Sequence, residues 1–454
     1  MRQHHSALIA RAEYYKIDAG AASDPRRHAA ADYVAQATIP EPIIVERIAA
    51  AGYWLAGGER WWIARGLSMV YWFAGAAFLF GAARRLTNVA GGLASAAVFL
   101  LMPYSIGASL SFQPDALAVL GMCAALFAMT RSGIGATVVC SMLPILVRPM
   151  TAFFLAPAMA VVLWPATTGP LGTRIRRVAL FIVISGAPAL IYVAYRFMTD
   201  ATMGARAGAM FAPGLLVSPG FWRGWAGLAW MAFGPVLLVA ALAGAWLAGG
   251  RTRALLMSLW GGYALYGLLF NLHISTHPYY QTIAVPMVAL SIAPLVAMVV
   301  RTGRPWMTLA APAAIVVALL MWGARQGVLT PHADPDRIAA YEAVGRITGH
   351  SRRVIFLTDN WGVPLRYYAD IAGRYWPAGF EIDMYRPMAA GIPDIDAEAR
   401  LRMLGAQIGG AEFFAVTDVD GWSRQPGLRA LLDGVARVRE RTDRVIVYEL
   451  GRRP

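Results

Sequence analysis

Long apolar runs dominate this sequence and limit what it can fold into. A run of about 20 apolar residues is long enough to cross a bilayer as a helix. Eight runs approach that length: 62–82, 88–105, 115–130, 178–197, 226–248, 254–272, 281–300 and 306–323. Two shorter runs between 134 and 164 are separated by Arg148-Pro149, and we interpret them as a helical hairpin or a kinked pair. With 58% hydrophobic and 15% charged residues, the chain is predicted to be a polytopic α-helical membrane protein of about ten membrane segments.

The arginines indicate how these segments are oriented. Basic residues favour the cytoplasmic side of short membrane loops. They occupy every second connection here: Arg84/Arg85, Arg131, Arg174/Arg176/Arg177, Arg251/Arg253 and Arg301/Arg304. The other connections, together with residues 1–60 and everything after residue 324, are therefore expected outside the cytoplasm. The net charge of +14 follows from this bias, so we expect no nucleic-acid partner.

Composition divides the chain into three regions. Residues 1–61 form a mostly polar first loop with amphipathic segments at 6–15 and 43–55, residues 62–323 form the transmembrane domain, and residues 324–454 form a small soluble α/β domain. In that last domain we expect strands at 354–358, 412–417 and 445–450, and helices at 339–348, 363–369, 397–408 and 428–438. It contains no G-x-G-x-x-G or phosphate-loop pattern, and we expect no cofactor.

Polar and charged residues gather in the connections predicted to face outward. They are Glu41 in I-P-E-P, Asp115 in S-F-Q-P-D-A-L, Arg148, and the run Asn271–Gln281, N-L-H-I-S-T-H-P-Y-Y-Q. Charged residues at a membrane boundary are costly, which makes them candidates for a functional site. Each also has a simpler interpretation. Asp115 and Glu41 suit helix starts, Arg148 suits an arginine that extends to the interface, and paired tyrosines suit an aromatic belt.

Metal and disulfide sites are not expected. His273 and His277 are four residues apart, as on one helix face, but Pro278 follows and no nearby carboxylate completes a ligand set. Cys123 and Cys140 lie inside apolar runs, where cysteine acts as a small hydrophobic residue.

Four motifs, in order, resemble those of the GT-C glycosyltransferases, the group of the protein O-mannosyltransferases and the lipid A aminoarabinose transferase. The opening M-R-Q-H-H-S-A-L-I-A-R-A-E-Y-Y is similar to the R-Q-T-x-T-A-x-x-A-R-x-Y-like run of the first extracytoplasmic loop. Residues 39–68 resemble the E-x-P, amphipathic helix and G-x-x-x-W-x-x-R-L-x-S series. F-Q-P-D-A-L and H-P-Y-Y-Q resemble F-Q-P-D-x-L and H-x-Y-Y-Q-L-P. The motifs cover residues 1 to about 300.

The resemblance implies a GT-C-like fold and a transferase that takes a sugar from a polyprenyl-phosphate donor. It assigns catalytic roles to the acids Glu41 and Asp115, and donor binding to His277, Tyr279, Tyr280 and Gln281. The outward-facing Arg2, Gln3, Arg11 and Arg148 are further candidates for donor binding, because an arginine can neutralise the lipid phosphate. The usual first-loop aspartate of the family lies before the R-Q run. We therefore expect that aspartate, and an eleventh helix, to be encoded upstream of Met1.

We predict an inverting transferase of the bacterial inner (plasma) membrane that acts on the extracytoplasmic face. Its partners would be the lipid-linked sugar, membrane lipids, and a glycan, lipid or protein acceptor. Inversion is expected because a single displacement needs only one attack at the anomeric carbon. Two alternatives stay open: a transporter or flippase of a lipid-linked sugar, and a non-catalytic GT-C-like subunit. A transporter favours internal repeats and charges at the bilayer midplane, and the sequence has no half-to-half repeat.

Overall fold

The structure is a computed structural model that describes residues 2–18, 23–37, 39–131, 133–200, 203–204, 211–301, 304–327, 334–376, 405, 408 and 410–451. The chain forms two compact units. We call the first the α/β unit (Met1–Ile39, Glu46–Ile63 and His332–Pro454) and the second the membrane unit (Pro40–Val45 and Ala64–Pro331). The first and last of the three predicted regions thus contribute to one and the same unit.

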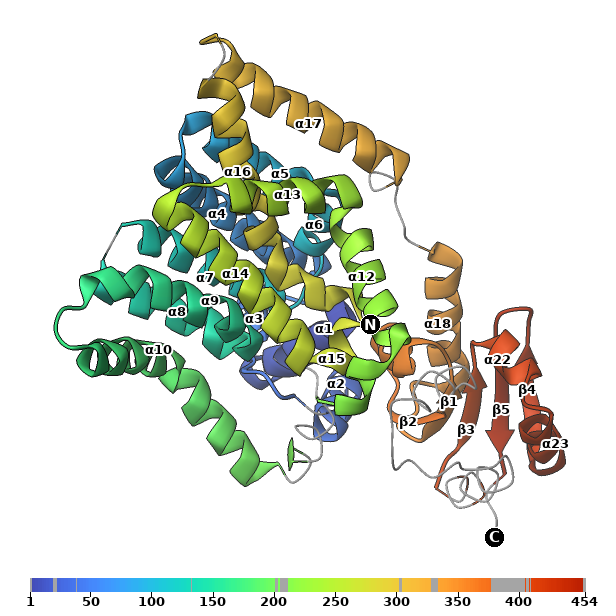
Figure 1. Ribbon diagram of the computed structural model, residues 1–454. Helices are drawn as coiled ribbons and strands as arrows, with labels where there is room; N and C mark the ends of the chain where they lie inside the picture. Colours follow the sequence, from blue (N-terminus) through green and yellow to red (C-terminus); the bar gives the residue numbers. More distant parts are fainter. Residues whose placement is uncertain are drawn as a thin grey trace. The chain divides into compact units, whose positions relative to one another are not determined.

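Helices build the membrane unit (Figure 1). They are α4 (Trp61–Leu86), α5 (Val89–Leu101), α6 (Pro103–Ser109), α7 (Asp115–Thr130), α8 (Ile134–Val147), η1 (Pro149–Thr151), α9 (Ala152–Leu163), η2 (Trp164–Ala166), α10 (Leu171–Thr199), η3 (Pro213–Val217), α12 (Pro219–Phe233), α13 (Pro235–Leu247), α14 (Gly250–Leu269), α15 (Asn271–Ile274), η4 (Pro278–Ala284), α16 (Val285–Arg301) and α17 (Met307–Arg325). Every apolar run expected from the sequence falls on these helices.

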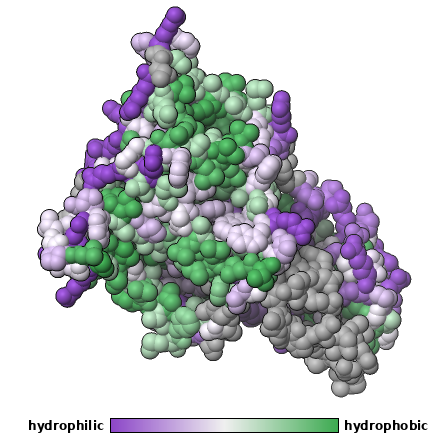
Figure 2. Space-filling model, viewed as in Figure 1, coloured by the Kyte–Doolittle hydropathy of each residue, from purple (hydrophilic) through white to green (hydrophobic). Residues whose placement is uncertain are grey.

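The surface of the membrane unit suits a lipid environment. Figure 2 shows broad hydrophobic areas over its helices, whereas the described part of the α/β unit visible in that view is mostly hydrophilic. Large apolar side chains such as Phe73, Ile191 and Trp246 are more than half exposed. Among the described residues, four helices are long and apolar enough to span a membrane, or six if each of two bent pairs counts as one span. The chain is therefore an integral membrane protein, as predicted, and the number of about ten segments stays a prediction.

Two of the predicted runs are broken rather than straight. The run 226–248 bends by 91° between α12 and α13, and the run 88–105 bends by 64° between α5 and α6. At the first break Gly234 adopts a φ of 71° and Pro235 follows. Proline cannot supply the N–H that continues a helix, and glycine tolerates the positive φ, so the chain turns there. Each of these two apolar runs therefore forms a bent pair of helices rather than one straight helix.

The α/β unit has a five-stranded sheet in the order β2-β1-β3-β5-β4. Its strands are β1 (Val354–Leu357), β2 (Gly373–Trp376), β3 (Phe413–Val416), β4 (Ala436–Arg441) and β5 (Ile446–Leu450). Strand β1 pairs in parallel with β2 and β3, and β5 pairs antiparallel with β3 and β4. Alternate residues of β1 enter different cores because side chains point to opposite faces of a strand: Ile355 and Leu357 join one core, Val354 and Phe356 the other.

Helices cover both faces of this sheet (Figure 1). They are α18 (Pro335–Thr348), η5 (Asn360–Gly362) and α19 (Val363–Ala369) toward one core, and α22 (Val419–Ser423) and α23 (Pro426–Val435) toward the other. The unit also holds α1 (Arg2–Ile17), α2 (Pro25–Gln36) and most of α3 (Ile44–Leu55). The fold class predicted from the sequence, a polytopic helical membrane protein with a small α/β domain, is thereby confirmed.

Several details of the α/β prediction need correction. Strands β2 and β4 and helix α2 were not expected, and the helix expected at 428–438 ends at Val435, where β4 begins. The sequence of β4, A-R-V-R-E-R, is charged because it is an edge strand, whose exposed ladder is protected by charged side chains. The helix expected at 397–408 lies almost entirely outside the described residues.

Candidate functional site

An ion cluster lies at the point where α8 ends. Arg148 caps α8 in an extended conformation, φ −139° and ψ 92°, as expected of a residue that precedes proline. Its Nε donates to Oδ1 of Asp115 at 3.0 Å, its Nη2 to the other Asp115 oxygen, and its Nη1 to Glu41. The Asp115 contact is bidentate, which fixes the plane of the guanidinium. Three residues from separate predicted loops are thus brought together.

Burial makes this cluster unusual. Arg148 and Asp115 are each only 3% exposed, so the interpretation that Arg148 extends to the interface is wrong. Buried ions carry a large desolvation penalty, which only close pairing offsets. Glu41 is the more accessible carboxylate, with a side chain 17% exposed against 4% for Asp115. Glu41 can therefore leave Arg148 more easily than Asp115 can.

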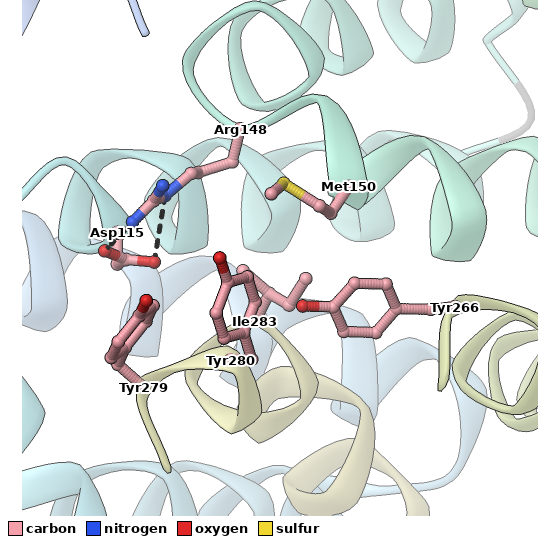
Figure 3. A pocket seen from close by; sticks show the side chains of 7 residues that line it. All are labelled: Asp115, Arg148, Met150, Tyr266, Tyr279, Tyr280 and Ile283. Atoms are coloured by element: carbon pink, nitrogen blue, oxygen red, sulfur yellow. Dashed lines mark hydrogen bonds and ion pairs between the residues drawn. The ribbon is translucent and has the colours of Figure 1, made fainter. Parts of the chain in front are cut away.

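A pocket opens beside the ion cluster (Figure 3). It is lined by Asp115, Arg148, Met150, Tyr266, Tyr279, Tyr280 and Ile283. These residues come from α7, the turn after α8, α14 and η4. The ring centroids of Tyr279 and Tyr280 are 4.5 Å apart, and that of Tyr266 is 6.5 Å from that of Tyr280. Figure 3 shows that the hydroxyls of Tyr279 and Tyr280 point toward Asp115 and Arg148.

The turn η4 positions these tyrosines. Pro278 stands at its first position, where a missing N–H costs no helical hydrogen bond. The hydroxyl of Tyr104 on α6 lies 2.7 Å from the Pro278 carbonyl oxygen, to which it donates, and 2.8 Å from the Thr282 hydroxyl. These bonds hold both ends of the Tyr279-Tyr280 segment.

The two other predicted residues of this loop lie outside the pocket lining. Gln281 is fully buried, and its Oε1 accepts from the Tyr263 hydroxyl at 2.8 Å. The His277 ring lies 5.4 Å from the Tyr279 ring and 6.2 Å from that of His273. No group of three or more His, Cys, Asp or Glu side chains that could hold a metal occurs within the described ranges.

The remaining predicted residues, Arg2, Gln3 and Arg11, belong to α1 of the α/β unit. Arg11 is 4% exposed, and it donates from Nε to Glu59 at 2.7 Å and from Nη1 to Asp370 at 2.8 Å. Burial acts to lower the pKa of Arg11, but the carboxylates of Glu59 and Asp370 outweigh it and hold the pKa above its ordinary value. The contacts of Arg11 tie α1 to the end of α19, and its role in donor binding stays a prediction.

Sequence reasoning missed Tyr266 and Met150. Tyr266 belongs to an apolar helix in which Trp260, Tyr263 and Phe270 also occur at helical spacing. Only the rotation of α14 decides which of these rings reaches the pocket, and the sequence carries no local signal for that rotation.

The fold is shared with solved membrane proteins. It is similar to that of ArnT and of an Archaeoglobus fulgidus oligosaccharyltransferase, as expected from the resemblance of the four motifs to those of GT-C glycosyltransferases. No protein-family model matches the chain, and no curated protein matches it in sequence. The likeness is therefore one of fold.

Three solved structures illustrate this likeness. ArnT from Cupriavidus metallidurans in the apo state has a TM-score of 0.57 at 14% identity, over 100% of this chain and 94% of that one. ArnT bound to undecaprenyl phosphate has 0.53 at 15%, over 99% and 93%. The Archaeoglobus fulgidus oligosaccharyltransferase complex with zinc and sulfate has 0.52 at 10%, over 84% and 60%.

Proposed function

We propose that this chain transfers a sugar from a polyprenyl-phosphate donor to an acceptor hydroxyl, with inversion at the anomeric carbon. The observation that carries the proposal is the buried Arg148, held by Asp115 and Glu41 beside a tyrosine-lined pocket of a membrane unit. Support also comes from the fold likeness to ArnT, of which one structure contains undecaprenyl phosphate. The proposed location is the bacterial plasma membrane, with the α/β unit on the extracytoplasmic face.

The charges of the cluster suggest how the donor binds. One guanidinium and two carboxylates carry a net charge of −1, which by itself does not attract a phosphate. In the proposed complex the donor phosphate replaces Glu41 on Nη1 of Arg148. Asp115 keeps its two hydrogen bonds and positions the guanidinium, and Glu41 becomes free to act as a base.

The reaction then needs one displacement. The acceptor oxygen attacks the anomeric carbon, and the bond from that carbon to the phosphate oxygen breaks. The bonding electrons pass to the polyprenyl phosphate, whose added negative charge Arg148 stabilises. The proton of the acceptor hydroxyl passes to the Glu41 carboxylate. The products are the glycosylated acceptor and the lipid phosphate.

The test is transfer of radiolabelled sugar from a polyprenyl-phosphate donor by the purified protein. Glu41→Gln should lower kcat by about 100-fold or more because the base is lost. Asp115→Asn should mainly raise the KM for the donor because Arg148 is no longer held in place. Glu440→Gln, on the exposed edge strand β4, is the matched control and should keep wild-type rates. Undiminished transfer in both site variants would refute the assignment, and donor movement across vesicles without transfer would favour a transporter.

A further inference from the structure

One hydroxyl in the pocket has no role in the proposal above. Tyr266 is fully buried, and its hydroxyl has no hydrogen-bond partner in the part of the chain that the structure describes. The residue lines the pocket, and its oxygen points into it rather than into the packed core (Figure 3). Buried hydroxyls are nearly always hydrogen-bonded, because an unpartnered one is destabilising. The Tyr266 hydroxyl is therefore a candidate to bind a ligand.

The Tyr266 ring packs among three phenylalanine rings. Its centroid lies 5.9 Å from that of Phe154, 6.1 Å from Phe153 and 5.6 Å from Phe270. Gly262, one turn earlier on α14, has no room for a Cβ because that atom would lie 2.2 Å from the Phe153 carbonyl oxygen. Helices α14 and α9 are thus in close contact, and the hydroxyl is preorganised for a group that enters the pocket.

The surroundings indicate what that group is. Arg148 and Tyr266 both line the pocket, one from the turn after α8 and the other from α14. Arginine only donates, and a phenol donates readily to an anion. Both donors therefore suit an anionic group such as a phosphate.

We infer that the Tyr266 hydroxyl donates a hydrogen bond to an oxygen of the donor lipid's phosphate, alongside Arg148. The inference rests on the proposed function and adds a phosphate-positioning residue to it. It also predicts opposite effects of one substitution. Tyr266→Phe removes a hydroxyl that has no partner among the described residues, so the melting temperature stays equal or rises. The affinity for a polyprenyl monophosphate falls about tenfold or more, as expected for a lost hydrogen bond to a charged group.

The experiment measures binding to the purified full-length protein of a polyprenyl monophosphate and of the matching polyprenol, which lacks the phosphate. Tyr53→Phe is the matched control. Tyr53 is also fully buried with no described partner for its hydroxyl, but it does not line the pocket. It should leave monophosphate affinity unchanged.

The outcomes separate the two proposals. Weaker monophosphate binding by Tyr266→Phe alone, with polyprenol binding unaffected, supports the inference. Equal monophosphate binding by wild type and Tyr266→Phe overturns the inference and leaves the proposed function standing. A wild-type protein that binds the monophosphate no better than the polyprenol overturns the proposed function itself. A fall in melting temperature for Tyr266→Phe would also count against the inference, because it would reveal a structural partner for the hydroxyl.

Discussion

Replacing Arg148 by methionine should destabilise the membrane unit through the charge it leaves behind. Methionine is apolar and similar in length, but it removes the guanidinium from two carboxylates. Asp115, which is 3% exposed, then stays buried without its cation. Removal of one partner from a buried ion pair costs about 3–5 kcal/mol. At about 2 °C per kcal/mol for a unit of this size, the melting temperature should fall by about 6–10 °C.

A double-mutant cycle distinguishes this mechanism from a simple packing defect. Melting temperatures of the purified protein in one detergent would be compared for wild type, Arg148→Met, Asp115→Asn and the double variant. Because Asp115→Asn removes the orphaned charge, the double variant should recover most of the stability that Arg148→Met loses. Strictly additive losses, or a loss below about 1 kcal/mol as in an exposed pair, would refute the reasoning.

Three further predictions concern packing, pH and topology. Gly262→Ala should lower the melting temperature and the folded yield, because its Cβ would lie 2.2 Å from the Phe153 carbonyl oxygen, while Gly261→Ala, with no atom within 4 Å, should not. Burial, and then the charge of Arg2, lower the pKa of His5 from 6.5 to about 4. The folded protein thus binds fewer protons than the unfolded chain between these values, and its stability should fall as the pH falls from 6.5 to 4. His5→Gln should flatten that part of the melting-temperature profile, and an unchanged slope would contradict the assignment. A reporter active only outside the cytoplasm should be active when fused to the C-terminus, and activity of a cytoplasm-only reporter there would contradict the topology.

The membrane fold could be predicted because its determinants are local. Apolar runs of helical length are properties of short windows, and every expected run lies on a helix. The orientation expected from the alternating arginines stays a prediction. The bends between helices are harder to predict from the sequence. A Gly-Pro pair such as Gly234-Pro235 can kink a helix or end it, and the residues alone do not decide which. In the α/β unit the buried strands were identified from their apolar sequence, whereas the charged edge strand β4 resembled a helix.

The candidate site was only partly predictable. The predicted topology placed Glu41, Asp115 and Arg148 in connections on the same side of the membrane, and the structure brings the three residues into contact. Arg148 bonds to Glu41, 107 residues away in sequence, and to Asp115, 33 residues away. Both contacts depend on how the helices pack, which the sequence does not show locally. The same holds for Tyr266, because a tyrosine that faces a pocket and one that faces the core have the same sequence context.

The α/β unit is discontinuous, and this sets the timing of its folding. Helix α1 and the sheet domain lie at opposite ends of the chain, and Arg11 bonds to Asp370, 359 residues later. Roughly 270 residues separate the early segments of the unit from its late one. At 5–20 residues per second, synthesis of that interval takes roughly 15–55 s. During this time the first helices exist without their partners, so Arg11 and Glu59 become buried only after the last membrane helix has been made.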